Sequence, residues 1–298
     1  MRNEIKGFLL VLTAAFFWAL SGTLAKMMFH NDISPYQLVQ VRMFWSGILL
    51  WIYLRVKNKE LLKIDKEDLM YFIIIGIPGL ALLQFTYLFS ISQTNVATAI
   101  FLQYFAPIFI MIYVLLRKQE EWSTAKIITL ILAFIGCFLI LFGGENFGLA
   151  VNLPGLISGF GSAITFAFYT IYSKKGLKKY NALTILTYGL LFGSVLWSLI
   201  IPPWKVFVQG YDFKTYLFFL WIVLFSSILP YSLYTKGISL TLPSTASITA
   251  LMEPVFAVFM AYMLLGEMLT TLQFVGGMFV LAAVAILQNF EKPKCKPS

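Results

Sequence analysis

The sequence has few charged residues. Asp, Glu, Lys and Arg make up 12% of its 298 residues, whereas hydrophobic residues make up 60%. A water-soluble domain carries about twice that share of charge, so lipid must solvate most of this surface. The net charge of +9 does not indicate nucleic-acid binding, because the basic residues lie in short segments between apolar runs. We therefore expect a lipid bilayer as partner and no nucleic acid.

Residues that hold metals or form disulfides are also scarce. The chain has two cysteines, Cys137 in an apolar run and Cys295 in a polar tail, and one histidine, His30. This set gives no disulfide framework and no metal-ligand spacing. The phosphate-binding pattern GxxxxGK followed by Ser or Thr is absent too. The sequence thus predicts no metal and no cofactor, and any transport has to use a solute or ion gradient instead of ATP.

Long apolar runs dominate what is present. A transmembrane helix needs about twenty apolar residues, because the hydrocarbon layer is about 30 Å thick and a helix rises about 1.5 Å per residue. Ten runs qualify, and none shows the alternation of a barrel strand. The predicted spans are 7–29, 36–54, 69–90, 95–116, 125–143, 154–173, 182–202, 214–236, 243–265 and 271–290. The predicted fold class is an all-α integral membrane protein with ten transmembrane helices.

Positive charges are distributed unevenly between alternate loops. If the N-terminus is cytoplasmic, the outside loops hold only Lys205 and Lys214, while Lys26 and Arg42 fall within spans. All other basic residues fall on the inside: Arg2, Lys6, Arg55, Lys57, Lys59, Lys63, Lys66, Arg117, Lys118, Lys126, Lys174, Lys175, Lys178, Lys179, Lys236, Lys292, Lys294 and Lys296. Loops rich in Lys and Arg stay in the cytoplasm. We expect a multi-pass protein of the cell membrane with both termini cytoplasmic.

The two halves of the chain resemble each other at a shift of 146 to 148 residues. AAFFWALSGTLAK at 14–26 aligns with SAITFAFYTIYSK at 162–174, and YLFSISQTNVATAIFLQYFAP at 87–107 aligns with YTKGISLTLPSTASITALMEP at 234–254. Five helices per half is an odd number, so the second half must cross the membrane in the opposite sense. The sequence predicts two inverted-topology five-helix repeats at 1–146 and 147–290, with a cytoplasmic tail at 291–298. Such repeats place a substrate site at their interface, near the membrane midplane.

The segment EPVFAVFMAYMLLGE at 253–267 resembles the ninth-helix signature of the drug/metabolite transporter superfamily, EamA branch. APIFIMIYVLLRKQE at 106–120 keeps the proline and final glutamate of that frame, but Arg117 and Lys118 replace its usual Leu-Gly. FFWALSGTLAK at 16–26 resembles the opening of such a half. The resemblance implies ten helices around a central cavity, and export or exchange of amino acids, nucleobases, sugars or related metabolites.

Glu253 is the carboxylate that falls well inside a predicted span, among thirteen Asp and Glu residues. A charged group at the bilayer centre costs roughly 2.5 to 3.5 kcal/mol on insertion scales, so it should face a wet cavity, a partner or a proton pathway. We take Glu253 as the proton-coupling candidate. The alternative is a neutral or paired side chain that braces helix packing. Arg42, about six residues into the second span, could be its partner or could have a packing role.

Four prolines occupy equivalent places in the two halves: Pro107 and Pro254, and Pro78 and Pro230. Proline cannot donate to the carbonyl four residues earlier, so it kinks a helix. Carbonyls freed at membrane depth are tolerated where they line a cavity. We therefore expect the fourth and ninth spans beside the pathway, and hinges or simple bends at Pro78 and Pro230.

Polar and aromatic residues on these spans, and on the first and sixth, are the candidates for lining a substrate cavity. Each of the aromatic residues could instead pack in the core or anchor at the interface. Buried glutamines are better candidates, because lipid supplies no partner for an amide. The candidates are Trp18, Gln84, Tyr87, Gln103, Tyr104, Tyr169, Tyr231, Tyr234 and Glu253.

The function predicted is a secondary-active transporter, an exporter or exchanger of small metabolites such as amino acids or related compounds, working by alternating access. A flippase for lipids or lipid carriers on the same scaffold is the alternative. A membrane-embedded enzyme would need paired carboxylates, a histidine cluster or a metal set near one interface. None appears, because Glu120 and Glu121 adjoin only in a predicted loop and without histidine partners. We therefore predict no enzymatic activity. Monomer and homodimer both remain open.

Overall fold

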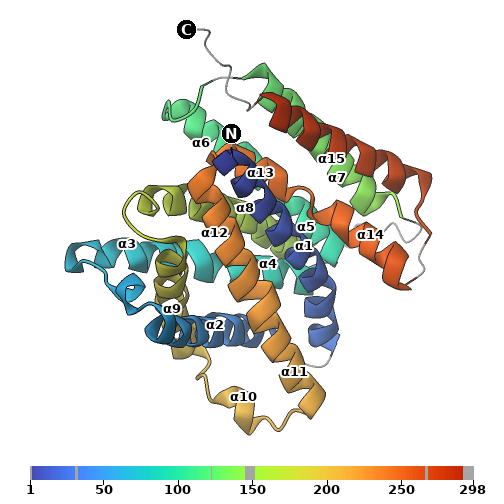
Figure 1. The fold of residues 1–298 in the computed structure, drawn as a ribbon. Coiled ribbons are helices and arrows are strands. Elements are labelled where there is room, and N and C mark those ends of the chain that lie inside the picture. Colours follow the sequence, from blue (N-terminus) through green and yellow to red (C-terminus); the bar gives the residue numbers. More distant parts are fainter. Residues whose placement is uncertain (1, 31–32, 122, 145–151, 266–267, 291–298) are drawn as a thin grey trace.

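The structure is a computed structural model that describes residues 2–30, 33–121, 123–144, 152–265 and 268–290. Within these residues the regular secondary structure is entirely helical, so the fold is that of an all-α integral membrane protein. The predicted tail at 291–298 and the predicted boundary between the repeats at residues 146 and 147 lie outside the described residues. Figure 1 shows a bundle of crossing helices, with α7 and α15 side by side at its edge.

The five spans of the first half are formed by eight helices. Helices α3, η3 and α4 follow one another without a break, and α5 and α6 form one interrupted rod. The bounds are α1 Arg2–His30, α2 Pro35–Lys57, α3 Leu69–Ile74, η3 Ile75–Ala81, α4 Leu82–Gln93, α5 Val96–Gln103, α6 Ala106–Leu116 and α7 Thr124–Phe142, with short 3-10 helices η1 Lys59–Leu62 and η2 Lys66–Asp68 between α2 and α3.

The second half repeats this order. Helices α11, η4 and α12 are continuous, and α13 and α14 form its interrupted rod. The bounds are α8 Leu153–Gly176, α9 Ala182–Ile200, α10 Lys205–Val208, α11 Phe213–Trp221, η4 Ile222–Ile228, α12 Leu229–Leu240, α13 Pro243–Ala250, α14 Glu253–Leu265 and α15 Thr271–Phe290. Each of the ten predicted spans therefore coincides with a helical rod.

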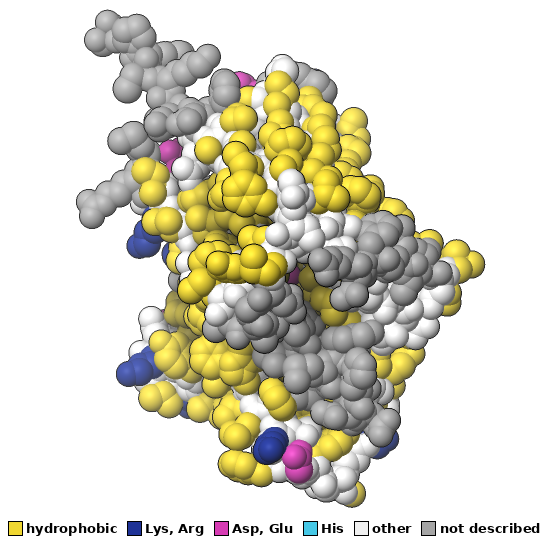
Figure 2. Space-filling view, turned by 90° about the vertical axis from the view of Figure 1, so that its right-hand side faces the viewer, with side chains coloured by type: hydrophobic (Ala, Val, Ile, Leu, Met, Phe, Trp, Pro, Cys, Tyr) yellow, Lys and Arg dark blue, Asp and Glu magenta, His cyan; other side chains and the backbone are white. Residues whose placement is uncertain are grey.

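Nine helical segments among the described residues are long and apolar enough to cross a membrane. The predicted second span, in the 23-residue helix α2, falls outside this set. Its polar residues explain the difference, because Gln37, Gln40 and Arg42 are buried against other helices and need no apolar character. Figure 2 shows one face of the bundle, where hydrophobic side chains cover much of the described surface.

The two proline pairs change the helices in two different ways. Pro78 lies inside the π-helical turn η3, and Pro230 is the second residue after the equivalent π-helical turn η4. A wider turn accommodates a residue that has no N–H to donate. At the other pair the helix is interrupted: Pro107 and Pro254 are each the second residue of a new helix, α6 and α14. The kinks expected in these two spans are therefore short interruptions, at which one tight turn replaces the regular α-helical hydrogen bonds.

The two halves pack together through helix pairs that follow the repeat. Helix α1 packs on α12 and, equivalently, α8 packs on α4, while α2 packs on α9 and α7 on α15. The α7–α15 crossing requires glycine at its centre. A Cβ atom on Gly136 would lie 2.7 Å from the carbonyl oxygen of Gly276, and a Cβ atom on Gly276 would lie 2.7 Å from that of Gly136. Small residues of this kind let backbones approach closely within one chain.

Loops predicted to lie on the same side of the membrane meet at the same end of the bundle. At one end Lys179 pairs with Asp65 and Asp68, joining the loop after α2 to the loop after α8. At the other end Asn152 Nδ2 donates to the Gln93 carbonyl at 2.7 Å. The first end is the one that is rich in Lys and Arg, and we call it the basic end.

Candidate functional site

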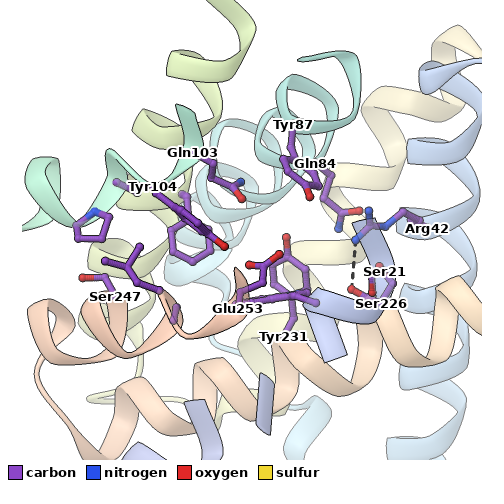
Figure 3. A pocket seen from close by; sticks show the side chains of 16 residues that line it. Ser21, Arg42, Gln84, Tyr87, Gln103, Tyr104, Ser226, Tyr231, Ser247 and Glu253 are labelled. Atoms are coloured by element: carbon purple, nitrogen blue, oxygen red, sulfur yellow. Dashed lines mark hydrogen bonds between the residues drawn. The ribbon is translucent and has the colours of Figure 1, made fainter. Parts of the chain in front are cut away.

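A cavity lies where the two interrupted rods meet (Figure 3). It is bounded by the C-terminal ends of α5 and α13 and by the first residues of α6 and α14. About 50 Å³ is open to water-sized molecules, which is room for a few waters. Both halves contribute to the lining: Trp18, Ser21, Arg42, Gln84, Tyr87, Gln103, Tyr104, Ala106, Pro107, Phe166, Ser226, Tyr231, Ser247, Ala250, Leu251 and Glu253.

The helix breaks put backbone as well as side chains at this cavity. Tyr104 N–H bonds the Phe101 carbonyl at 3.1 Å, and Leu251 N–H bonds the Ile248 carbonyl at 3.1 Å, so each short helix closes with a tight turn. Prolines 107 and 254 cannot donate to the carbonyls four residues earlier, those of Gln103 and Ala250. Both of these residues line the cavity. Interrupted helices of this kind are a common way to build polar sites at membrane depth.

Seven of the nine residues predicted to line a cavity do so, namely Trp18, Gln84, Tyr87, Gln103, Tyr104, Tyr231 and Glu253. Tyr169 and Tyr234 are not among the lining residues. Both are fully buried between α8 and α12, where the Tyr169 hydroxyl lies 2.6 Å from Thr235 Oγ1 and the Tyr234 hydroxyl 2.9 Å from Thr170 Oγ1. These two tyrosines tie the helices behind the cavity together.

Glu253 is the first residue of α14, and its side chain is 7% exposed. Figure 3 shows its carboxyl group projecting into the cavity, with the Tyr104 hydroxyl pointing toward it. The Tyr104 hydroxyl itself makes no hydrogen bond of ordinary geometry. Among the ion pairs of the described residues none involves Glu253. A buried carboxyl without a cationic partner, beside a small polar cavity, is a chemically suitable proton carrier.

Arg42 reaches the same cavity from α2 and is 5% exposed. Its Nε donates to Ser227 Oγ at 3.0 Å and its Nη2 to the Ser226 carbonyl at 3.2 Å, so η4 holds the guanidinium in place. The ion pair with Glu253 that the sequence left open is not formed in this structure. Arg42 is instead a buried cation whose described partners are uncharged.

Gln84 is 1% exposed, and neither its amide nitrogen nor its amide oxygen has a hydrogen-bond partner in the structure. Buried polar groups are almost always paired, because an unpaired one costs about 1 to 3 kcal/mol. The Tyr104 hydroxyl is a second unpaired group in the same lining. Unpaired donors and acceptors that surround an open space indicate that water or a polar ligand completes them.

Aromatic rings form one wall of the cavity. The Trp18 ring lies 5.9 Å from the Phe166 ring and 5.3 Å from the Tyr231 ring, centroid to centroid, in edge-on arrangements. Such contacts fix the rings at defined angles. The wall offers a flat apolar surface beside the charged groups.

Several lining residues were not among the cavity-lining candidates from the sequence: Ser21, Ala106, Phe166, Ser226, Ser247, Ala250 and Leu251, together with Arg42, which was considered only as a partner of Glu253 or a packing residue, and Pro107, which was predicted as a kink. The internal repeat could have found some of them. Phe166 is equivalent to the candidate Trp18, and Ala250 to the candidate Gln103. Small residues and serines carry no such signal, since they are common at helix contacts throughout a membrane bundle.

A wider hollow of about 450 Å³ lies at the basic end, beside α6, α8 and the start of α13. Lys174, Lys175, Lys178 and Glu120 line it. Helix α13 lies between the two spaces, because Pro243 at its N-terminus lines the hollow and Ala250 at its C-terminus lines the cavity. Eight helical residues span roughly 10 Å. No cluster of His, Cys, Asp or Glu suited to a metal occurs in the part of the chain that is described.

Comparison with known families accounts for this architecture. The EamA-like transporter family matches the chain twice, over residues 5–142 and 153–288. The chain belongs to the EamA-like transporter family. Each match covers one five-helix half, so this EamA-like protein contains two copies of the family's unit. The superfamily resemblance inferred from the motifs is confirmed, and the protein is a membrane transporter.

Relatives of this EamA-like protein are named as transporters, and the similarity extends over most of each chain. The uncharacterized inner membrane transporter YicL of Salmonella typhimurium is 27% identical, over 96% of both chains. The riboflavin transporter ImpX of Fusobacterium nucleatum is 25% identical, over 95% of this chain and 98% of its own. The S-adenosylmethionine/S-adenosylhomocysteine transporter of Chlamydia trachomatis is 25% identical, over 87% and 81%.

A solved crystal structure has the same fold. It superposes with a TM-score of 0.75 at 13% identity, covering 95% of this chain and 98% of its own. The likeness extends over both repeats.

Proposed function

We propose that this protein is a secondary transporter that moves a small metabolite by alternating access. One observation carries the proposal: both repeats contribute interrupted helices to a central cavity that contains buried, unpaired polar groups. Inverted repeats with interrupted helices at a central site suit a cycle in which one half rocks against the other. In this conformation the cavity is too narrow for a metabolite, as expected for a closed step of such a cycle.

Substrate would reach the site from the cytoplasm through the hollow at the basic end. The Lys and Arg residues at that end support a cytoplasmic location for it and for both termini, in a cell membrane. Movement of α13, which separates the hollow from the cavity, would open the route. We therefore propose export or exchange of solutes made in the cytoplasm.

Glu253 is the proposed proton carrier. No ATP-binding motif is available to supply energy. One proton that crosses 100 mV provides about 2.3 kcal/mol, which is enough for roughly fifty-fold concentration of a neutral solute. The position of Glu253 in the cavity, without a cationic partner, supports this role.

The substrate is proposed to be an amino acid or a related small metabolite. The relatives named for riboflavin and for S-adenosylmethionine carry ring-containing solutes, and the aromatic wall here would suit an apolar or ring-containing side chain. Transport is favoured over catalysis, since the family and its relatives are transporters. The polar and aromatic lining gives no support to an aliphatic groove for lipid.

The test is flux into proteoliposomes that contain the purified protein, with a panel of amino acids, riboflavin and S-adenosylmethionine. A pH gradient should drive uptake of at least one solute, and Glu253→Gln should abolish the effect of the gradient. Glu60→Gln, at an exposed carboxylate, is the matched control and should transport as the parent does. The proton role is refuted if Glu253→Gln keeps the pH dependence, and transport itself is refuted if no solute moves.

A further inference from the structure

Two groups that can carry opposite charges, Arg42 and Glu253, line one cavity without forming an ion pair with each other. Arg42 and Glu253 are both more than nine-tenths buried. Figure 3 shows Arg42 beside Gln84 on one side of the cavity, while Glu253 and Tyr104 lie toward the other. A closed bundle would gain from joining these charges directly, because unpaired buried charge is costly. Their separation leaves a positive side and a negative side.

The positive side has hydrogen-bond donors to spare. A guanidinium has five N–H groups, and the structure engages Arg42 through Nε to Ser227 and through Nη2 to the Ser226 carbonyl. Both contacts come from η4 and neither acceptor is charged. These contacts hold the side chain, and the donors on Nη1 lack a described partner. A planar guanidinium with free donors is the group best matched to a carboxylate.

Gln84 adds to this side of the cavity. Its amide nitrogen and oxygen are both unpaired, although the side chain is 1% exposed. Gln84 sits on α4, so its position does not depend on the η4 contacts that fix Arg42. The amide N–H groups can donate to an anion that also contacts the guanidinium. Two side chains from separate helices therefore leave unused donors at one place.

We propose that Arg42 and Gln84 bind the carboxylate of a zwitterionic amino-acid substrate, whose ammonium group pairs with Glu253 across the cavity. The assignment rests on the proposed transport function and adds the residues that recognise the charged groups. Such a ligand neutralises both buried charges at once, and its side chain lies against the wall formed by Trp18 and Phe166. Glu253 cannot hold a proton and an ammonium group together, so the assignment agrees with exchange of substrate for protons.

Binding to the purified full-length protein tests the carboxylate site. The probes are leucine, methionine and phenylalanine, each compared with its carboxamide, which lacks the carboxylate, and with its N-acetyl form, which lacks the ammonium group. For at least one amino acid we expect the acid to bind at least tenfold more tightly than either derivative. Equal affinity for acid and carboxamide, or no binding of any of the three, would overturn the assignment.

Substitutions test which side chains recognise the carboxylate. Gln84→Met removes an amide that bonds nothing in the folded protein, so the variant should fold and should lose most of the tenfold preference for acid over carboxamide. Arg42→Gln should lose it as well. Gln40→Met is the control, since Gln40 is equally buried but lies outside the cavity. A Gln84→Met protein that keeps the full preference contradicts the proposal.

Gln84→Glu gives a second, independent result. The new carboxylate would supply the counter-ion that Arg42 lacks, so this variant should melt no lower than the parent and should bind none of the three amino acids. Unchanged binding of the acids would overturn the carboxylate site. If the carboxylate site is overturned but proteoliposomes with the parent protein transport other solutes, the transport proposal stands. If they transport no solute at all, both the carboxylate site and the transport proposal are refuted.

Discussion

Trp18 and Phe166 occupy equivalent positions in the two repeats, and their rings meet edge-on with centroids 5.9 Å apart. The contact therefore joins α1 to α8 across the interface of the two halves, directly at the cavity. Residues that a repeat makes equivalent touch each other only where the pseudo-symmetry axis passes between them. The contact between Trp18 and Phe166 therefore lies at the pseudo-symmetry axis that relates the two halves.

The ring contact predicts a measurable coupling. Trp18→Leu and Phe166→Leu, made singly and together, should give an interaction free energy of about 0.5 to 1.5 kcal/mol in a double-mutant cycle of unfolding in mixed micelles. Trp18→Leu combined with Phe274→Leu, at an exposed position on α15, is the control and should be additive. Additive effects in the Trp18 and Phe166 cycle would show that the two halves do not meet in this way.

Neighbouring glycines of α15 should respond in opposite directions. Gly276→Ala places a Cβ atom 2.7 Å from the Gly136 carbonyl oxygen, and such overpacking costs typically 1 to 3 kcal/mol. Gly277 has open space around its Cβ position, so Gly277→Ala should be neutral or stabilise the helix by up to about 1 kcal/mol. Thermal unfolding in detergent measures both. Equal effects of the two substitutions would refute the packing of α7 on α15.

Membrane topology can be tested with single cysteines in a Cys137→Ala, Cys295→Ser background. Lys178→Cys lies at the basic end and Lys214→Cys at the start of α11, at the other end, and both positions are exposed. An impermeant maleimide applied to intact cells should label Lys214→Cys only, and should label both after lysis. Labelling of both in intact cells would refute the predicted orientation of the second half, in which the loop after α8 is cytoplasmic and the loop after α9 is outside.

The Lys126–Glu120 ion pair of the first half joins the second half at the basic end through hydrogen bonds to Ser244. The Glu120 carboxylate accepts from Lys126 Nζ at 2.6 Å and from the Ser244 backbone N–H at 3.2 Å, so it caps the N-terminal part of α13. The Glu120 side chain is 3% exposed, and removing one partner of a buried pair costs about 3 to 5 kcal/mol. Glu120→Ala should therefore lower the melting temperature strongly. Lys63→Ala, which breaks the exposed pair with Glu60, should change it little.

Hydropathy and the internal repeat together predicted the rods and their equivalence between the two halves, since an apolar run of sufficient length has few alternatives to a helix in lipid. Which face of a rod points inward was harder to predict. Tyr169 and Tyr234 looked like Tyr87 and Tyr231 in sequence, but threonines on the neighbouring helix satisfy their hydroxyl groups in the core. Helix packing angles decide such cases, and a single sequence does not contain them.

The prolines illustrate a similar limit. The equivalence of the prolines between the two halves could be recognised in the sequence, and the two members of each pair lie at the same kind of turn. Whether a proline bends a helix or interrupts it depends on the turn around it: π-helical turns accompany Pro78 and Pro230, while tight turns precede Pro107 and Pro254. The sequence did not place Arg42 among the cavity-lining candidates for a related reason. Serines of η4, which are distant in sequence, hold its guanidinium at the cavity.

The small size of the central cavity affects how affinities should be interpreted. A conformation with about 50 Å³ of free space excludes every candidate solute, so binding must begin from a wider shape that the unloaded protein visits for only part of the time. A measured dissociation constant then equals the intrinsic one divided by the fraction of molecules in the wider shape. Substitutions that loosen the contacts of α13 at the basic end would raise that fraction, and would tighten apparent binding without touching the solute.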